Sequence, residues 1–218
     1  FLLAERAGMR PLWYKELDFN ELYKTMEEIP FQDLKGRFDL LDIEAPANKV
    51  MPFMVEGYHI PDENFNMIDL WPKGVEIRTP VAQSLDECLQ TYKEIYLRMQ
   101  QAFSKTERTM VALSHHPTQT EFYGPQNKRR YDYWQWAMEV MTTYGPDINI
   151  SFPSDLLKEV QFDQHDFDRK LNYYAPALVA LSTGSPFVNG KLWQWEFGKY
   201  GKSFRTHKRS IIAPVVEY

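Results

Sequence analysis

Cysteine is nearly absent from this sequence, which contains one, Cys88, among 218 residues. An internal disulfide is therefore excluded, and we expect a protein of the reducing cytoplasm. No apolar run reaches the roughly 18 residues of a membrane-spanning helix, so no membrane partner is expected. Positive charge is also scarce, because 25 Lys and Arg residues stand against 30 Asp and Glu residues. The resulting formal charge of −5 argues against a general nucleic-acid-binding protein, which is usually basic.

Apolar and aromatic residues are plentiful, at 44% and 15% of the chain. That content can offset the entropy of ordering a core, so we expect residues 1–218 to fold as a single domain. Both ends read as apolar strand segments, at residues 1–4 and 211–216. Free termini are more often polar, and we therefore expect the chain to be part of a longer domain.

Local patterns predict helices and strands along most of the chain. A capping box formed by Ser84 and Glu87 begins the clearest helix, and an apolar stripe follows it. The stripe consists of Leu85, Cys88, Leu89, Tyr92, Tyr96, Met99 and Phe103. Further helices are predicted for residues 18–28, 128–143 and 163–182. Strands are predicted for residues 1–5, 38–43, 54–60, 74–81, 109–114 and 147–152.

The pattern within the strands indicates the fold class. Residues 74–81 and 147–152 alternate between apolar and polar side chains, whereas the central strands of a parallel sheet are apolar on both faces. No glycine-rich phosphate loop follows any of the predicted strands. We therefore predict an α+β fold, with a mostly antiparallel sheet and helices packed on one of its faces.

Polar side chains from three predicted strands could gather on the other face of this sheet. Glu76 and Arg78 lie on one strand, His116 follows the second, and Asp147 and Asn149 lie on the third. Carboxylate and amide oxygens are the ligands that a hard divalent cation prefers, which favours a cation site on this face. A sheet face that is merely solvated would show the same alternation, and this alternative stays open.

Two adjacent histidines, His115 and His116, raise the alternative of a zinc site. Neighbouring residues on a strand point to opposite faces, so the pair is poorly placed to bind one metal ion. No second cluster of His or Cys stands near them in the sequence. We favour the interpretation that the histidine is held by hydrogen bonds as part of the structure.

Residues 191–209 form a basic segment in a chain that is acidic as a whole. Its only acid is Glu196, and its cations are Lys191, Lys199, Lys202, Arg205, Lys208 and Arg209. The planar guanidinium of an arginine suits phosphate oxygens, which indicates a phosphate-binding segment. A solvated loop of arbitrary charge is the simpler alternative.

Several motifs resemble those of the glutamate–cysteine ligase family, in the order in which that family has them. Residues 74–81, Gly-Val-Glu-Ile-Arg-Thr-Pro-Val, resemble its V-E-L-x-T-P strand, and the capped helix follows. Residues 114–117 resemble its G-T-H-P strand end. Residues 176–187 resemble its helix that ends in an N-S-P-F-like turn, and residues 203–207 resemble its Y-R-T-R-like strand. The resemblance spans nearly the whole chain and points to the carboxylate–amine ligase branch.

This resemblance implies a glutamine-synthetase-like fold, in which the concave face of an antiparallel sheet holds Mg²⁺ ions and ATP. It also implies a catalytic domain that forms an amide through an acyl phosphate, from ATP, an amino-acid carboxylate and an amine. On the same resemblance, Glu76 is expected to bind metal, and Arg205 is expected to be catalytic and to contact phosphate. The residues expected to contact substrates are Arg78, His116, Asp147 and Asn149.

Two departures from the family pattern bear on this expectation. The family's paired acidic motif would precede Phe1, and Asp147 stands where the family often has His or Gln. A non-catalytic homologue that acts as a binding or assembly subunit is therefore the second hypothesis, and a divalent-metal hydrolase using Glu76 and His116 is the third. The sequence names neither the carboxylate nor the amine, and it leaves a homo-oligomer open.

Overall fold

The structure is a computed structural model of the chain. It describes residues 1–34, 52–64, 66–124, 126, 138, 140–147, 149, 152, 155–159, 163–182 and 185–193. The chain falls into two compact units, Phe1–Tyr144 and Gly145–Tyr218. Among the described residues, no helix has the length and apolar content needed to cross a membrane. The strand predicted at residues 38–43 lies outside the described residues.

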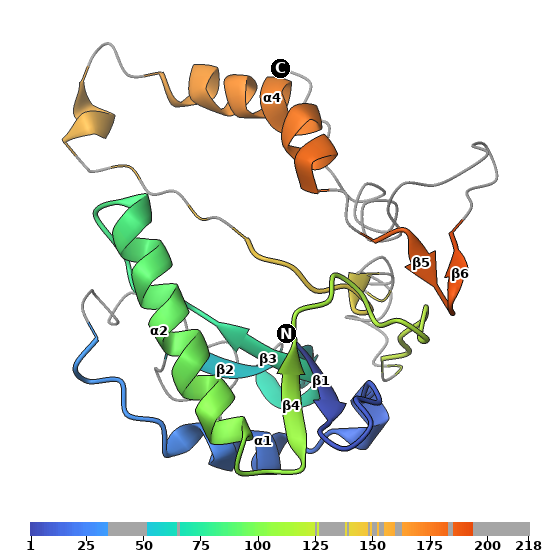
Figure 1. The fold of residues 1–218 in the computed structure, drawn as a ribbon. Coiled ribbons are helices and arrows are strands. Elements are labelled where there is room, and N and C mark those ends of the chain that lie inside the picture. Colours follow the sequence, from blue (N-terminus) through green and yellow to red (C-terminus); the bar gives the residue numbers. More distant parts are fainter. Residues whose placement is uncertain are drawn as a thin grey trace. The chain divides into compact units, whose positions relative to one another are not determined.

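Two pairs of antiparallel strands form the framework of the first unit (Figure 1). β1 (Leu2–Glu5) pairs with β4 (Arg108–Val111), and β2 (Phe53–Pro61) pairs with β3 (Met67–Ile77). The predicted α+β class with antiparallel strands is therefore confirmed. The strand predicted at residues 74–81 begins earlier and ends earlier in the structure, as the second half of β3.

The described strand pairs remain separate two-stranded sheets, where the sequence predicted one sheet. The backbone nitrogen of Phe1 donates to the Val75 carbonyl at 2.6 Å, and the Val75 nitrogen donates to the Phe1 carbonyl at 3.2 Å, so β1 and β3 do touch. Gly74 permits this contact, because a Cβ there would lie 2.1 Å from the Phe1 carbonyl oxygen. The β2–β3 register shifts after Glu56 and after Ile60, and such bulges add twist to a strand pair.

The helices α1 (Phe19–Glu27) and α2 (Leu85–Phe103) follow the N-capping residues Asp18 and Ser84, of which the sequence predicted Ser84 as a cap. The Asp18 carboxylate accepts a hydrogen bond from the first turn of α1 at 2.9 Å. The Ser84 hydroxyl accepts one from the Glu87 backbone nitrogen at 3.2 Å. Each bond satisfies a backbone donor that has no partner within its helix, and both helix predictions are confirmed.

We expect Ser84→Ala to lower the free energy of unfolding by about 1 kcal/mol, because the capping acceptor is lost. Ser84→Asp keeps an acceptor at the same position and should retain nearly all of the stability. Urea denaturation monitored by circular dichroism measures both variants. Equal losses in the two variants would show that the cap contributes little.

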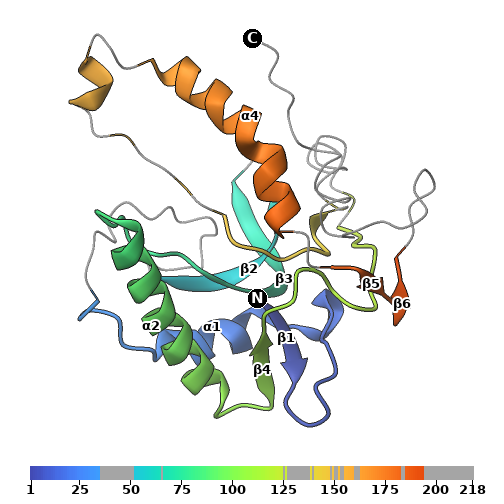
Figure 2. The ribbon, with the colours of Figure 1, turned by 45° about the horizontal axis from the view of Figure 1, so that its top comes forward.

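The apolar sides of α1 and α2 share one core with the strands. Figures 1 and 2 show α2 running alongside β4. The buried members of this core include Leu3, Leu22, Met26, Phe53, Val55, Val75, Ile95, Met99, Phe103 and Met110. The helices thus cover the face of β3 to which Val75 points, which leaves the neighbouring side chains of β3 on the other face.

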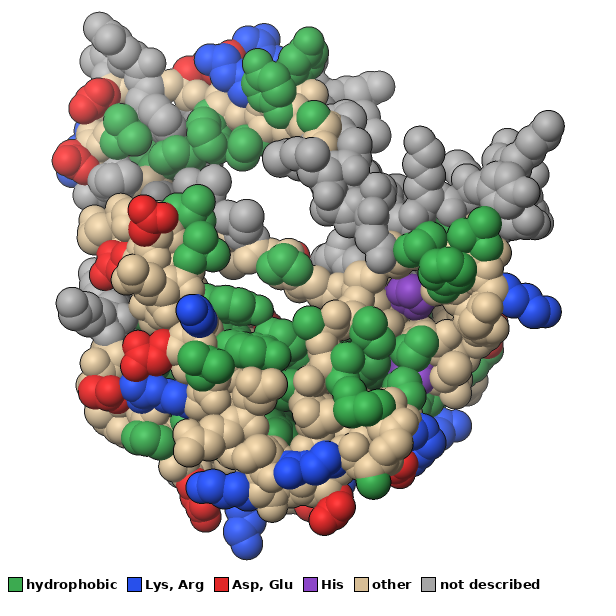
Figure 3. Space-filling view, in the orientation of Figure 1, with side chains coloured by type: hydrophobic (Ala, Val, Ile, Leu, Met, Phe, Trp, Pro, Cys, Tyr) green, Lys and Arg blue, Asp and Glu red, His purple; other side chains and the backbone are tan. Residues whose placement is uncertain are grey.

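The apolar stripe predicted for α2 is wrong over the N-terminal half of the helix. Leu85 and Leu89 are 66% and 54% exposed, and hydrophobic side chains are visible at that end of α2 in Figure 3. The buried face is instead formed by Thr91, Ile95, Met99 and Phe103, and Ile95 was not in the predicted stripe. The C-terminal half of α2 is the part that packs on the strands. The spacing of apolar residues predicts which face of a helix is apolar, but it does not predict which part of that face is buried.

The described part of the second unit contains helix α4 (Gln164–Ser182), a short 3-10 helix η3 (Leu156–Lys158) and a hairpin. α4 confirms the helix predicted at residues 163–182. The hairpin pairs β5 (Phe187–Val188) with β6 (Lys191–Leu192). Its two turn residues, Asn189 and Gly190, both have positive φ, which is the geometry of a tight two-residue turn.

Two predicted elements differ from the structure where it describes them. Residues 147, 149 and 152 lie in no strand, so the strand predicted at residues 147–152 is not formed there. The helix predicted at residues 128–143 falls mostly outside the described residues. Its predicted end is too late, because Thr143 forms a β-bridge with His115. Tertiary pairing with another segment overrides the local helical pattern at this point.

Candidate functional site

Glu76 and Arg78 lie together on the side of β3 that faces away from the core. Val75 is fully buried under the helices, and alternation along the strand turns Glu76 the other way. Arg78 follows the end of β3, and its Nε donates to Glu76 Oε1 at 3.2 Å. The sequence prediction that these two side chains share a face is confirmed.

A second carboxylate, Glu56 of β2, stands beside Glu76. In the β2–β3 register, Met54 lies directly opposite Glu76, so Glu56 is its diagonal neighbour on the same face. Glu56 acts on the Glu76 carboxyl group and favours its protonated form. The sequence analysis missed Glu56, although a single acid inside the apolar run from Phe53 to Tyr58 was a signal that could have found it.

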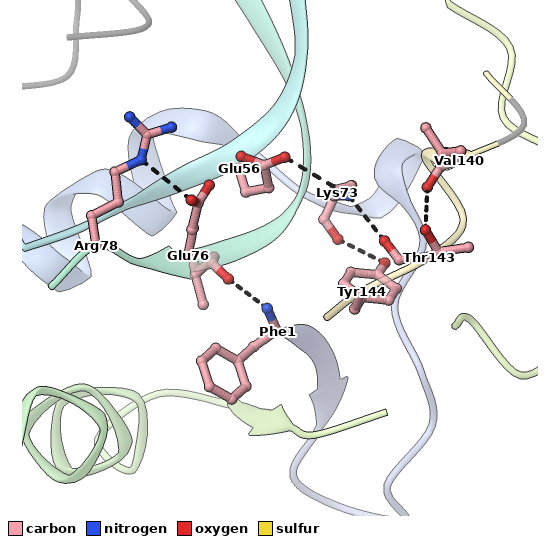
Figure 4. A network of polar contacts seen from close by, with 9 residues as sticks. Phe1, Glu56, Lys73, Glu76, Arg78, Val140, Thr143 and Tyr144 are labelled. Atoms are coloured by element: carbon pink, nitrogen blue, oxygen red, sulfur yellow. Dashed lines mark hydrogen bonds and ion pairs between the residues drawn. The ribbon is translucent and has the colours of Figure 1, made fainter. Parts of the chain in front are cut away.

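Lys73, which lies on β3 as Glu76 does, completes a row of four charged side chains (Figure 4). Its Nζ lies 3.8 Å from Glu56 Oε1 and donates to the Thr143 carbonyl at 3.0 Å. The Tyr144 hydroxyl in turn donates to the Lys73 carbonyl at 3.0 Å. The order along the row is Arg78, Glu76, Glu56 and Lys73, so two cations flank two carboxylates.

The environment raises the pKa of Glu76 to about 7. Burial is the largest cause, because it disfavours the charged form, and the hydrogen bond and charge of Glu56 act in the same direction. Arg78 opposes them by favouring the carboxylate. Glu76 would therefore lose its proton near neutral pH, and a cation placed beside its carboxyl group would favour that loss.

The donor set of this row fits a hard divalent cation. Mg²⁺ prefers oxygen ligands and is commonly bound through one or two protein carboxylates, with water and phosphate oxygens in the other positions. Glu56 and Glu76 can supply two carboxylates from neighbouring strands. Within the described residues, no group of three or more His, Cys, Asp or Glu side chains could hold a metal ion. Two carboxylates are a partial ligand set for such an ion, whose other positions are commonly taken by water and phosphate oxygens.

His116 makes contacts that hold the loop after β4. Its side chain is 1% exposed, and its Nδ1 accepts hydrogen bonds from the backbone nitrogens of Thr118 at 3.3 Å and Gln119 at 3.0 Å. The ring packs edge-on against Trp13, next to the 3-10 helix η1 (Tyr14–Glu16). Burial lowers the pKa of His116 to about 4, so the ring is neutral at pH 7. These contacts agree with the structural interpretation of this histidine.

The remaining expected site residues are not placed relative to this row. Asp147 and Asn149 are exposed residues of the second unit. Arg205 and the basic segment beyond residue 193 lie outside the described residues. Their expected roles stay predictions.

Comparison with known proteins identifies the family of the chain. A sequence profile of the family described as glutamate-cysteine ligase family 2 (GCS2) matches residues 53–204. This range is more than half of the chain and contains all four charged residues of the row. Comparison with curated proteins and with solved structures finds no match. The chain belongs to the glutamate–cysteine ligase family 2, as its motifs indicated.

Proposed function

We propose that this chain carries part of the active site of an ATP- and Mg²⁺-dependent carboxylate–amine ligase with a glutamine-synthetase-like fold. The observation that carries the proposal is the carboxylate pair of Glu56 and Glu76 on an antiparallel strand pair, in a member of this family. Family membership supports a ligase of the glutamate–cysteine ligase type. The row supports it because nucleotide-dependent ligases must manage the charge of a triphosphate.

In the proposed reaction, a substrate carboxylate oxygen attacks the γ-phosphorus of ATP and ADP leaves. The amine nitrogen then attacks the acyl carbon of the acyl phosphate, phosphate leaves, and the amine loses a proton to solvent. Mg²⁺, when bound, neutralises phosphate charge and orients the triphosphate. Glu56 and Glu76 would hold the ion, and Arg78, oriented by Glu76, would favour negative charge on the transferred group. Arg205 is proposed as a second phosphate contact.

Three further residues are proposed to contact and select the substrates. Asp147 would repel a carboxylate-bearing substrate and attract an amine or another cation. We therefore propose that glutamate with cysteine is not the preferred pair. His116 and Asn149 are retained as substrate-contact candidates, although the hydrogen bonds of His116 favour a structural role for it.

The direct test is to measure ADP and phosphate release by the chain in the longest reading frame that contains it. We expect release to require Mg²⁺, a carboxylate and an amine together, and to stop when EDTA is added. A panel of amino-acid carboxylates and amines identifies the substrates. Tight ATP binding without turnover on any pair would favour the non-catalytic homologue. Metal-dependent hydrolysis without ATP would favour the hydrolase.

A further inference from the structure

Lys73 is held in place by contacts that do not depend on Glu56. Its side chain is 12% exposed, and its Nζ donates to the Thr143 carbonyl at 3.0 Å. The ammonium also lies 5.2 Å from the centre of the Tyr144 ring, within the range of a cation–π interaction. A carbonyl oxygen and an aromatic face both stabilise a cation, so this position is built for the ammonium group.

The segment that holds Lys73 is itself anchored in the first unit. The Tyr144 nitrogen donates to the Ser114 carbonyl, and the His116 nitrogen donates to the Thr142 carbonyl, each at 2.9 Å. The Tyr144 hydroxyl donates to the Lys73 carbonyl, so β3 and this segment bind each other in both directions. Lys73 therefore has little freedom to move away when another cation approaches Glu56.

The charges of the row cancel when both carboxyl groups are ionised. Glu56 and Glu76 contribute two negative charges, and Lys73 and Arg78 contribute two positive charges. A divalent cation at the carboxylates would be repelled by an ammonium group a few ångströms away, and this repulsion is strong where water is partly excluded. The ion pair that Lys73 makes with Glu56 is long at 3.8 Å and adds little by itself.

We propose that Lys73 is a specificity-determining residue that acts as a resident counter-ion and weakens the binding of a free divalent cation to Glu56 and Glu76. The inference rests on the proposed function, which places the cation at this pair. A cation that arrives with phosphate oxygens brings its own negative charge and is repelled less. The row would therefore favour a metal–phosphate complex over the free metal ion.

The test measures Mn²⁺ binding by electron paramagnetic resonance, with the metal alone as the probe. We expect Lys73→Met to bind Mn²⁺ roughly tenfold more tightly than the wild type, because the repelling charge is gone while the apolar stem is kept. Lys73→Arg keeps the charge and should bind like the wild type. Lys15→Met is the matched control, because Lys15 is an exposed lysine that also lies over a tyrosine ring, that of Tyr14.

A further variant separates charge from position. Tyr144→Phe removes the hydroxyl that bonds to the Lys73 carbonyl and leaves every charge of the row in place. It should lower stability slightly and leave Mn²⁺ affinity unchanged. Tighter Mn²⁺ binding in Tyr144→Phe equal to that in Lys73→Met would overturn the charge argument.

The outcomes distinguish this inference from the proposed function. If the wild type binds Mn²⁺ and Lys73→Met binds it equally or more weakly, the counter-ion role is wrong and the proposed function stands. If only Lys73→Met binds Mn²⁺, the counter-ion role is supported, and the native row does not hold a free metal ion. If no variant binds Mn²⁺ alone, the counter-ion role is overturned, and the proposed function is decided separately by the assay of ADP and phosphate release.

Discussion

Replacing Glu76 by glutamine should lower kcat/KM for amide formation on the order of 100-fold or more, while the protein stays folded. Glutamine has nearly the same shape, but it removes the ionisable carboxyl group, so Glu56 would be left as the only carboxylate of the row. Glu107→Gln is the matched control, because Glu107 is an exposed acid that is not part of the row. An unchanged kcat/KM in Glu76→Gln would remove this residue from the proposed mechanism.

The same variant also tests the raised pKa of Glu76, through the pH dependence of the free energy of unfolding. The pKa of Glu76 is raised from 4.5 to about 7, so between these values the folded protein binds more protons than the unfolded chain. The contribution of this group to stability is therefore fully present below pH 4.5 and is lost as pH rises through about 7. The glutamine of Glu76→Gln cannot ionise, so its contribution does not change with pH. We therefore expect the free energy of unfolding of the variant, measured relative to that of the wild type, to be higher at pH 8 than at pH 4.5. Urea denaturation at several pH values measures this difference, and parallel pH profiles would contradict it.

Gly74→Ala is expected to produce the largest loss of stability among the substitutions considered, about 3 kcal/mol. The new methyl group would lie 2.1 Å from the Phe1 carbonyl oxygen, and a backbone carbonyl in a strand cannot turn aside as a flexible side chain can. β1 and β3 would have to separate, with loss of the hydrogen bonds between Phe1 and Val75. Urea denaturation monitored by circular dichroism measures the loss.

Gly8→Ala is the control for this substitution. A Cβ at Gly8 has no atom within 4 Å, so its cost comes from the positive φ of 85° alone, which is roughly 1 to 2 kcal/mol. A loss in Gly74→Ala no greater than that in Gly8→Ala would show that β1 and β3 can move apart without penalty. Hydrogen exchange at the Val75 amide should be faster in Gly74→Ala and unchanged in Gly8→Ala.

Much of the candidate site could be predicted from local sequence. Alternation around Val75 placed Glu76 and Arg78 on one face, and the ion pair between them confirms it. The motif around Glu76 indicated the family, which the match over residues 53–204 confirms. Asp147, Asn149 and Arg205 remain predictions, because their roles depend on parts of the chain whose placement beside the row is not described.

The sequence by itself determined the features that depend on neighbours along the chain. These are the helical cap at Ser84, the antiparallel α+β class and the face of Glu76. Only the tertiary structure decided that Glu56 lies beside Glu76, that Lys73 flanks them, and that the N-terminal half of α2 stays uncovered. The physical reason is that helix and strand periods are set by local backbone geometry, whereas strand register depends on hydrogen bonds between segments far apart in sequence. A shift of the β2–β3 register by one residue would leave every local pattern intact and turn Glu56 away from Glu76.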